Sequence, residues 1–175
     1  MCLRVVALLE RFLFLSLLVS VSFPSCGSTK LEKTLAIIKP DGLLGNYTER
    51  VKETILESGF SILKEKTIQL DEDSVATFYA EHSAKNFFSS LVRYMISGPV
   101  LVMVLEKENA ISCWRTLMGP TDASKAKITH PYSIRAMCGT NYEKNCVHGS
   151  DSPRSAQREI SFFFSADAVT PHDEL

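Results

Sequence analysis

The feature that most constrains the fold is an alternation of short apolar runs with amphipathic segments. Residues 34–39 and 100–105 are mainly aliphatic, and runs of that length are typical of buried strands. Apolar side chains recur at helical spacing in residues 48–58, 108–117 and 153–164. With a loosely alternating strand at 60–70 and a short strand entering Val147, the order predicts an α+β fold. We expect a ferredoxin-like α/β sandwich, in which a four-stranded antiparallel sheet carries helices on one face.

Two less regular regions complete the pattern. Asp71, Glu72 and Asp73 predict the start of a helix, because negative charge is favourable in a first helical turn. A second helical pattern follows and ends at Gly98-Pro99. Residues 118–133 show no clear period and predict a long irregular loop, and loops of that length are usually functional or disordered. A functional loop is the favoured interpretation.

The first 27 residues are predicted to be a secretory signal. Arg4 and Arg11 precede an uncharged apolar run over residues 12–23, which is short of the roughly 20 residues that span a bilayer. The alternative is an uncleaved membrane anchor, but Glu10 and Arg11 interrupt the longer span that it needs. We therefore expect cleavage and no stable membrane span.

The other end of the chain carries a second targeting signal. Residues 165–175 are predicted to be a tail, and its last residues, His172-Asp173-Glu174-Leu175, match a signal that the endoplasmic reticulum retrieval receptor reads. Together with an entry signal, this predicts residence in the endoplasmic reticulum lumen. Asn46-Tyr47-Thr48 is a glycosylation sequon, and both a glycan and an unmodified turn stay open.

Cysteine count and charge exclude some classes of protein. Of five cysteines, Cys2 and Cys26 would leave with the signal, and Cys113, Cys138 and Cys146 would remain. Three thiols allow at most one disulfide within a chain. Free buried cysteines are the favoured interpretation, because a domain of this size can build its core without disulfides. A net charge of −1 with interspersed signs gives no basic surface for nucleic acid.

The segment that most strongly indicates a reactive site is Asn145-Cys146-Val147-His148-Gly149-Ser150-Asp151-Ser152. It places one histidine after an apolar pair and before a turn of small polar residues. A phosphate-binding loop of the Gly-x-x-x-x-Gly-Lys type is absent from the sequence, so side chains would have to bind any phosphate. Lysine, as a point charge, and arginine, through its planar fork, suit that task.

Taken with Lys39-Pro40-Asp41-Gly42, Arg115, Thr121 and Arg135, this segment resembles the nucleoside diphosphate kinase family over residues 33–164. The resemblance implies transfer of the γ-phosphate of ATP to a nucleoside diphosphate by a ping-pong mechanism, with His148 phosphorylated and Glu159 orienting its ring. It implies these nucleotide-binding residues: Lys39, Phe87, Arg115, Thr121, Arg135 and Asn145. Tyr79 and Ser150 would support the site, Phe88 would belong to the core, and Mg²⁺ would arrive on the nucleotide.

Two departures from the family pattern affect the expected assembly and activity. Residues 121–135 form a segment that is longer than in similar enzymes by about three residues, and the chain ends soon after residue 164. We therefore expect a monomer or dimer rather than a hexamer. Two alternatives to a nucleoside diphosphate kinase stay open: a nucleotide-binding module with weak or no catalysis, and a protein histidine kinase or phosphatase-like activity that uses the same histidine.

Overall fold

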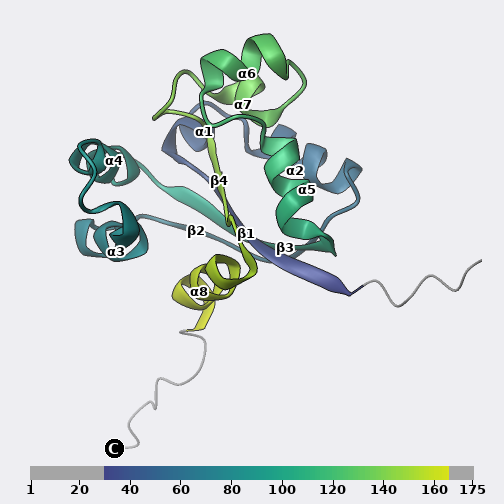
Figure 1. Cartoon of the computed structure of the whole chain (residues 1–175), viewed down its shortest axis with the longest axis horizontal. Helices are drawn as coiled ribbons and strands as arrows, with labels where there is room; N and C mark the ends of the chain where they lie inside the picture. The colour runs from purple at the N-terminus through teal and green to yellow at the C-terminus, as the bar shows by residue number, and fades with distance from the viewer. Residues whose placement is uncertain (1–29, 166–175) are drawn as a thin grey trace, which may run out of the picture.

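The computed structural model describes residues 30–165, and its centre is a four-stranded antiparallel sheet (Figure 1). The strands are β1 (Leu31–Ile38), β2 (Ser61–Ile68), β3 (Val100–Glu108) and β4 (Val147–Gly149). Their order across the sheet is β2-β3-β1-β4, and every neighbouring pair is antiparallel. This is the order of a ferredoxin-like fold, with α2 and α5 connecting β1 to β2 and β3 to β4. The predicted fold class is confirmed.

The helices also follow the sequence pattern, with several short additions. They are α1 (Pro40–Leu44), α2 (Thr48–Glu57), α3 (Glu72–Phe78), the 3-10 helix η1 (Ala80–His82), α4 (Phe88–Met95), α5 (Ala110–Met118), α6 (Ala123–Thr129), α7 (Ile134–Cys138) and α8 (Pro153–Phe164). The stretch predicted to be irregular contains α6, which begins where the Asp122 side chain accepts a hydrogen bond from the backbone N–H of Ser124. That helix buries only Ala123 and Ala126, so it has too few large apolar residues to show a period.

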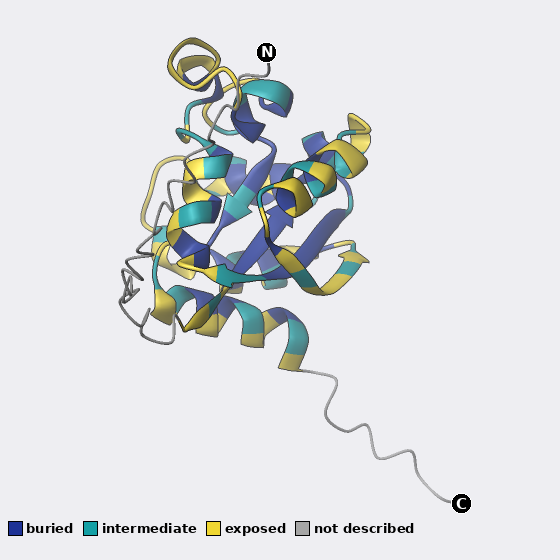
Figure 2. Cartoon of the chain, turned by 90° about the vertical axis from the view of Figure 1, so that its right-hand side faces the viewer, coloured by how far each residue is buried: buried dark blue, intermediate teal, exposed yellow. Residues whose placement is uncertain are grey.

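Helices cover both faces of the sheet, so the expectation of helices on one face was wrong. One core lies between the sheet and α2, α5 and α7, and a second core lies between the sheet and α3, α4 and α8. The extra cover comes from the α3–α4 segment between β2 and β3, together with α8. In β1, Ala36 and Ile38 face the first core, whereas Leu35 and Ile37 face the second. An unbroken apolar run is what a strand buried on both faces requires, and Figure 2 shows the strands as a mostly buried layer.

Strand β4 is short, but its position is tightly fixed. His148 pairs with Ile37 of the central strand β1, and the indole Nε1–H of Trp114 donates to the backbone carbonyl of His148 at 3.2 Å. A Cβ atom at Gly149 would lie 2.3 Å from the Trp114 ring, so no other residue fits there. The sequence therefore holds the backbone around His148 against a buried tryptophan.

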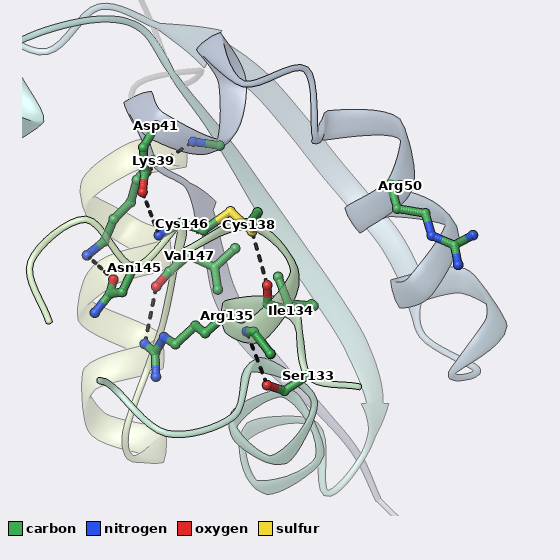
Figure 3. The surroundings of a disulfide bond; sticks show 12 residues. Lys39, Asp41, Arg50, Ser133, Ile134, Arg135, Cys138, Asn145, Cys146 and Val147 are labelled. Carbon is green, nitrogen blue, oxygen red and sulfur yellow. Dashed lines mark hydrogen bonds between the residues drawn. A yellow bond between two sulfur atoms is a disulfide. The ribbon is translucent and has the colours of Figure 1, made fainter. Parts of the chain in front are cut away.

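The cysteine expectation was wrong, because Cys138 and Cys146 form a disulfide and Cys113 is free (Figure 3). Cys138 ends α7 and Cys146 precedes β4. The fold brings their Cα atoms to 5.7 Å, within the usual range for a disulfide. A sequence separation of eight residues could not reveal this, because the pairing depends on how α7 packs beside β4.

Several expectations concern the ends of the chain and the surface. The predicted signal lies outside the described residues, as does the tail except for its first residue. Within residues 30–165, no helix is long and apolar enough to cross a membrane. Asn46 of the sequon is exposed, with a left-handed φ of 61°, in the turn between α1 and α2. Such a turn leaves its side chain accessible, and glycosylation stays a prediction.

Candidate active site

A cavity of about 650 Å³ lies beside β4 and gathers the side chains that the sequence pointed to. Its walls come from the α3–α4 region, the C-terminal part of α5, the segment before α6, α7, the segment before β4, and α8. These predicted residues line it: Lys39, Tyr79, Phe87, Arg115, Thr121, Arg135, Asn145, His148 and Glu159. Of the predicted site residues, Ser150 is the exception, because it is fully buried behind the wall.

His148 is held through one nitrogen of its ring. Its Nε2 lies 3.0 Å from Oε2 of Glu159, which projects from α8. The same Oε2 accepts a hydrogen bond of 2.8 Å from the Ser150 hydroxyl, and the Ser150 oxygen accepts one from the backbone N–H of Leu35 at 3.2 Å. The edges of Phe78 and Tyr79 pack against the imidazole at centroid distances of 5.4 and 5.9 Å. Both the direction and the plane of the ring are therefore fixed.

The ionisation of Glu159 decides which tautomer of His148 is present. Burial, the largest single influence, raises the pKa of Glu159, but hydrogen bonds from His148 and Ser150 and the charges of His148 and Arg158 outweigh it. The net pKa lies below its ordinary value, so Glu159 is a carboxylate at neutral pH. A carboxylate only accepts hydrogen bonds, so Nε2 carries the proton. Nδ1 is then the nitrogen with a free lone pair.

Lys39 lies where β1 passes into α1, and it is buried. Its ammonium group donates to Oδ1 of Asn145 at 2.8 Å. Burial, together with the charge of Arg135, lowers the pKa of Lys39 to about 8. Asn145 uses its amide group to donate to the backbone carbonyls of Thr121 and Tyr142, at 3.0 and 2.9 Å. Asn145 thus joins β1, the segment before α6 and the segment before β4.

Arg135 is a buried cation with one nitrogen left without a partner. It is 8% exposed, and its guanidinium donates to the backbone carbonyls of Gly119 and Val147 at 2.8 and 3.2 Å. Within residues 30–165, its Nε is the one buried side-chain polar atom without a partner. Burial and the nearby charge of Arg115 lower the pKa of Arg135 to about 10. An anion in the cavity would relieve the repulsion between the two arginines.

The opposite wall is aromatic. Phe87 precedes α4 and is 45% exposed, whereas its neighbour Phe88 packs against the second core. The His82 ring lies 5.8 Å from Phe87 and is stacked on Tyr79 at 6.2 Å. Burial and the charge of Glu159 raise the pKa of Tyr79, which therefore stays a neutral phenol. This wall offers flat apolar surface rather than charge.

Six further residues line the cavity that the sequence did not point to. They are Glu81, His82, Leu91, Asn141, Tyr142 and Glu143. Residues 141–143 follow α7 in a polar segment without a periodic pattern, so no signal in the sequence singled them out. Tyr142 is 64% exposed, and Ser90 of α4 donates to Glu143 at 2.6 Å. That hydrogen bond connects the aromatic wall to the segment before β4.

The cavity has no dedicated metal site. Among residues 30–165, no group of three or more His, Cys, Asp or Glu side chains could hold an ion. Asp151 lies at the rim, where hydrogen bonds from Ser155 and Ser152 lower its pKa. A Mg²⁺ ion typically binds through one or two carboxylates plus the phosphates of a substrate, and the cavity suits an ion that arrives that way.

Comparison with known proteins agrees with this geometry. Residues 32–169 match the family model described as nucleoside diphosphate kinase. The protein named probable nucleoside diphosphate kinase 5 of Arabidopsis thaliana is 62% identical over 144 residues, which are 79% of this chain and 100% of that protein.

Solved structures of the same family also superpose well. The Aquifex aeolicus nucleoside diphosphate kinase has a TM-score of 0.77 at 40% identity, covering 81% of this chain and 100% of that one. The enzyme from Halobacterium salinarum, in complex with CDP, has a TM-score of 0.74 at 34% identity, covering 83% of this chain and 95% of that one. The chain belongs to the nucleoside diphosphate kinase family.

Proposed function

We propose that this protein is a nucleoside diphosphate kinase that transfers the γ-phosphate of ATP to a nucleoside diphosphate through phosphohistidine. The observation that carries the proposal is the hydrogen bond of 3.0 Å between His148 Nε2 and Glu159. It leaves Nδ1 as the nucleophile, in a cavity that also contains Arg115, Arg135 and Lys39. In the first half-reaction Nδ1 forms a bond to the γ-phosphorus and the bond to the leaving ADP oxygen breaks. In the second, a diphosphate oxygen takes the phosphoryl group back.

The charges around His148 suit that reaction. Phosphoryl transfer spreads negative charge over the equatorial oxygens, and fixed cationic donors stabilise it without reorganising. Arg135 is already fixed by two backbone carbonyls. Arg115 and Thr121 are exposed at the mouth of the cavity, so they can approach a phosphate from the solvent side. Lys39 and Asn145 would bind the ribose and phosphate from the base of the cavity.

Magnesium enters this proposal as part of the substrate, MgATP. When bound, it neutralises charge on the phosphates. Asp151, at the rim of the cavity, is the carboxylate that could contact the ion or its water. At the other end, Phe87 would stack on the base, and because every base has a π-face, stacking tolerates several bases. The CDP complex of the Halobacterium salinarum enzyme supports nucleotide binding by this fold.

The test is the intact mass of the protein after incubation with MgATP, and again after addition of GDP. We expect one phosphoryl adduct that GDP discharges, and no adduct on His148→Ala. His130→Ala is the matched control, because His130 is exposed and lies outside this cavity. Absence of an adduct in a protein that binds ADP would contradict the proposal and favour a binding module. An adduct that GDP leaves intact would favour a protein histidine kinase.

We also propose that the protein acts in the endoplasmic reticulum lumen. The predicted signal and the His172-Asp173-Glu174-Leu175 address support this location, and the Cys138–Cys146 disulfide suits an oxidising compartment. The test is imaging of a tagged protein with and without the last four residues. Retention that is lost on their removal, together with a glycosidase-sensitive mass at Asn46, would support it. A cytosolic signal in both forms would contradict it.

We propose separately that the protein is a monomer or a dimer. The segment that motivates it contains α6, and it displays Ile128 and Tyr132 at 83% and 98% exposure. A contiguous exposed apolar patch is a common mark of an interface, and these two side chains would contribute to one in a larger assembly. Light scattering on the purified protein decides between them, and a stable hexamer would overturn the proposal.

A further inference from the structure

We propose that the Cys138–Cys146 disulfide is a positioning element of the phosphate site, so that its reduction weakens nucleotide binding and phosphoryl transfer while the domain stays folded. This inference rests on the proposed function. Cys138 lies three residues after Arg135 in α7, and Cys146 lies between Asn145 and β4, which carries His148. The bond therefore joins the helix that carries Arg135, a proposed phosphate-binding residue, to the segment that leads into the strand with the proposed nucleophile (Figure 3).

Helix α7 needs such a connection because it is short. It has five residues, and helices of that length have little stability of their own. Its side-chain hydrogen bond to the β4 strand comes from Arg135, which donates to the carbonyl of Val147 at 3.2 Å. Arg135 would then have to hold the helix in place and bind phosphate with the same guanidinium. The disulfide holds α7 independently and leaves Arg135 available for the ligand.

The other end of the disulfide is anchored to the base of the cavity. Asp41 accepts a hydrogen bond from the backbone N–H of Cys146 at 3.0 Å, and it also accepts one from the Tyr94 hydroxyl. The backbone N–H of Lys39 donates to the carbonyl of Cys146 at 2.8 Å. Cys146 also has a left-handed φ of 70°, which residues with a side chain seldom adopt. This network fixes Cys146 relative to Lys39, and the disulfide extends that fixed geometry to α7.

There is little space for two separate thiols at this place. Cys146 is fully buried and Cys138 is 8% exposed. A Cβ atom at Gly42 would lie 2.9 Å from the Cys146 sulfur, so a glycine is needed there for the sulfur to pack. Two thiol sulfurs must lie well beyond bonding distance, and in this packed region we expect their separation to shift α7 away from β4. Arg135 would move with it, and a misplacement of about 1 Å can cost on the order of a hundredfold in rate.

The redox step is ordinary thiol–disulfide exchange with a dithiol. A dithiol thiolate attacks one sulfur, the bond between Cys138 and Cys146 breaks, and the second thiol of the reagent completes the exchange. Two electrons and two protons reach the cysteines, and the reagent becomes a cyclic disulfide. Because the closed loop is short, with a sequence separation of eight residues, the bond restricts the unfolded chain less than a long-range disulfide would. Local geometry should therefore respond more than overall stability.

The experiment compares the full protein oxidised with glutathione disulfide and reduced with dithiothreitol, with thiols counted by alkylation and mass. We expect reduction to weaken ADP binding and to lower the rate of phosphohistidine formation by about tenfold to hundredfold. Circular dichroism should stay unchanged, and reoxidation should restore both functions. The double variant Cys138→Ser/Cys146→Ser should have the ADP affinity and transfer rate of the reduced protein, and dithiothreitol should change neither. Cys113→Ser is the matched control, since Cys113 is free and lies outside the cavity.

Each outcome gives a decision. Equal ADP affinity and equal rate in the two redox states would overturn the proposal, as would alkylation of both Cys138 and Cys146 in the oxidised protein. Loss of the folded spectrum on reduction would also overturn it, because the bond would then support the whole domain. If neither form transfers phosphate, the proposed function fails, and ADP affinity alone still tests the disulfide.

Discussion

The two walls of the cavity are built in different ways. The wall from α7 and β4 is buried and fixed by a disulfide, by backbone hydrogen bonds to Arg135 and by the Trp114 contact to His148. The wall from α3 to α4 is an aromatic surface, with Phe87 45% exposed. One side-chain hydrogen bond, from Ser90 to Glu143, connects it to the segment before β4. We infer that the first wall sets the position of the reacting atoms, whereas the second accepts different bases.

The difference shows what each step requires. Transfer of a phosphoryl group depends on donors held at fixed positions, because electrostatic stabilisation fails if they must reorganise. Stacking of a base depends on area and tolerates small shifts. Changes in the first wall should therefore reduce mainly the rate of transfer, and changes in the second should reduce mainly nucleotide affinity.

The largest effect should come from removing the fixed cation. Arg135→Ala is expected to lower kcat by about a hundredfold to a thousandfold, as loss of a preorganised donor does elsewhere. Steady-state kinetics with MgATP and GDP measures it. Arg50→Ala is the control, because Arg50 is exposed on α2 and pairs with Glu53 there. If the two variants had equal kcat, the α7–β4 wall would not set the chemistry.

A smaller loss is expected when the partner of His148 loses its charge. Glu159→Gln should slow phosphohistidine formation by about tenfold to hundredfold, because a hydrogen bond to a charged group contributes ~1.5–3 kcal/mol. Rapid quench with MgATP measures the rate, and Glu57→Gln at the exposed end of α2 is the control.

The same carboxylate predicts a pH dependence of stability. The pKa of Glu159 is lower in the folded protein than its ordinary value of 4.5. The hydrogen bonds to its carboxylate therefore stabilise the fold above that value, and the contribution is lost as pH falls through the lower folded pKa. Acid unfolding of Glu159→Gln should show less of this dependence below pH 4.5. An identical acid profile for the two proteins would contradict the assigned charge.

A substitution in the aromatic wall should change the affinity for nucleotides. Phe87→Ala is expected to raise KM for nucleoside diphosphates by about tenfold, since base stacking is worth ~1–3 kcal/mol, and to leave kcat nearly unchanged. The factor should be similar for purines and pyrimidines. Tyr132→Ala removes an exposed aromatic residue outside the cavity and should change neither constant. A loss confined to kcat would break the distinction between the walls.

The smallest effect should appear with pH. Because the pKa of Lys39 is about 8, its charged fraction falls about fourfold between about pH 7 and pH 8.5, and kcat/KM should fall with it. Folding stability should change in the opposite direction. The folded pKa is below the ordinary value of 10.5, so the unfolded chain binds more protons and stability rises with pH between these values. Lys39→Arg should flatten the kcat/KM profile, and an unchanged profile would contradict the assignment.

The sequence predicted most of the fold because its periods are strong. The apolar runs in β1 and β3 and the amphipathic pattern of α8 give strands and a helix close to their observed bounds. Helix α6 was missed because it buries only two alanines. The positions of α3, α4 and α8 on the second face were missed because a helical period does not say which face of the sheet the helix covers.

Prediction of the site depended on a different kind of information. Lys39, Arg115, Arg135 and His148 were found through resemblance of motifs, and the structure brings them to one cavity. Tyr142 and Glu143 were missed because a polar segment without a period gives no signal. The Cys138–Cys146 pairing was missed because it depends on a helix packing beside a distant strand.

The line of hydrogen bonds from Leu35 through Ser150 and Glu159 to His148 has a consequence for the proton inventory of the proposed reaction. Nε2 keeps its hydrogen whether Nδ1 bears a lone pair or a phosphoryl group. Neither half-reaction would therefore require the ring to gain a proton from water or to lose one to it. In the proposed reaction, forward and reverse transfer would start from the same tautomer, and we expect a solvent isotope effect close to unity in both directions.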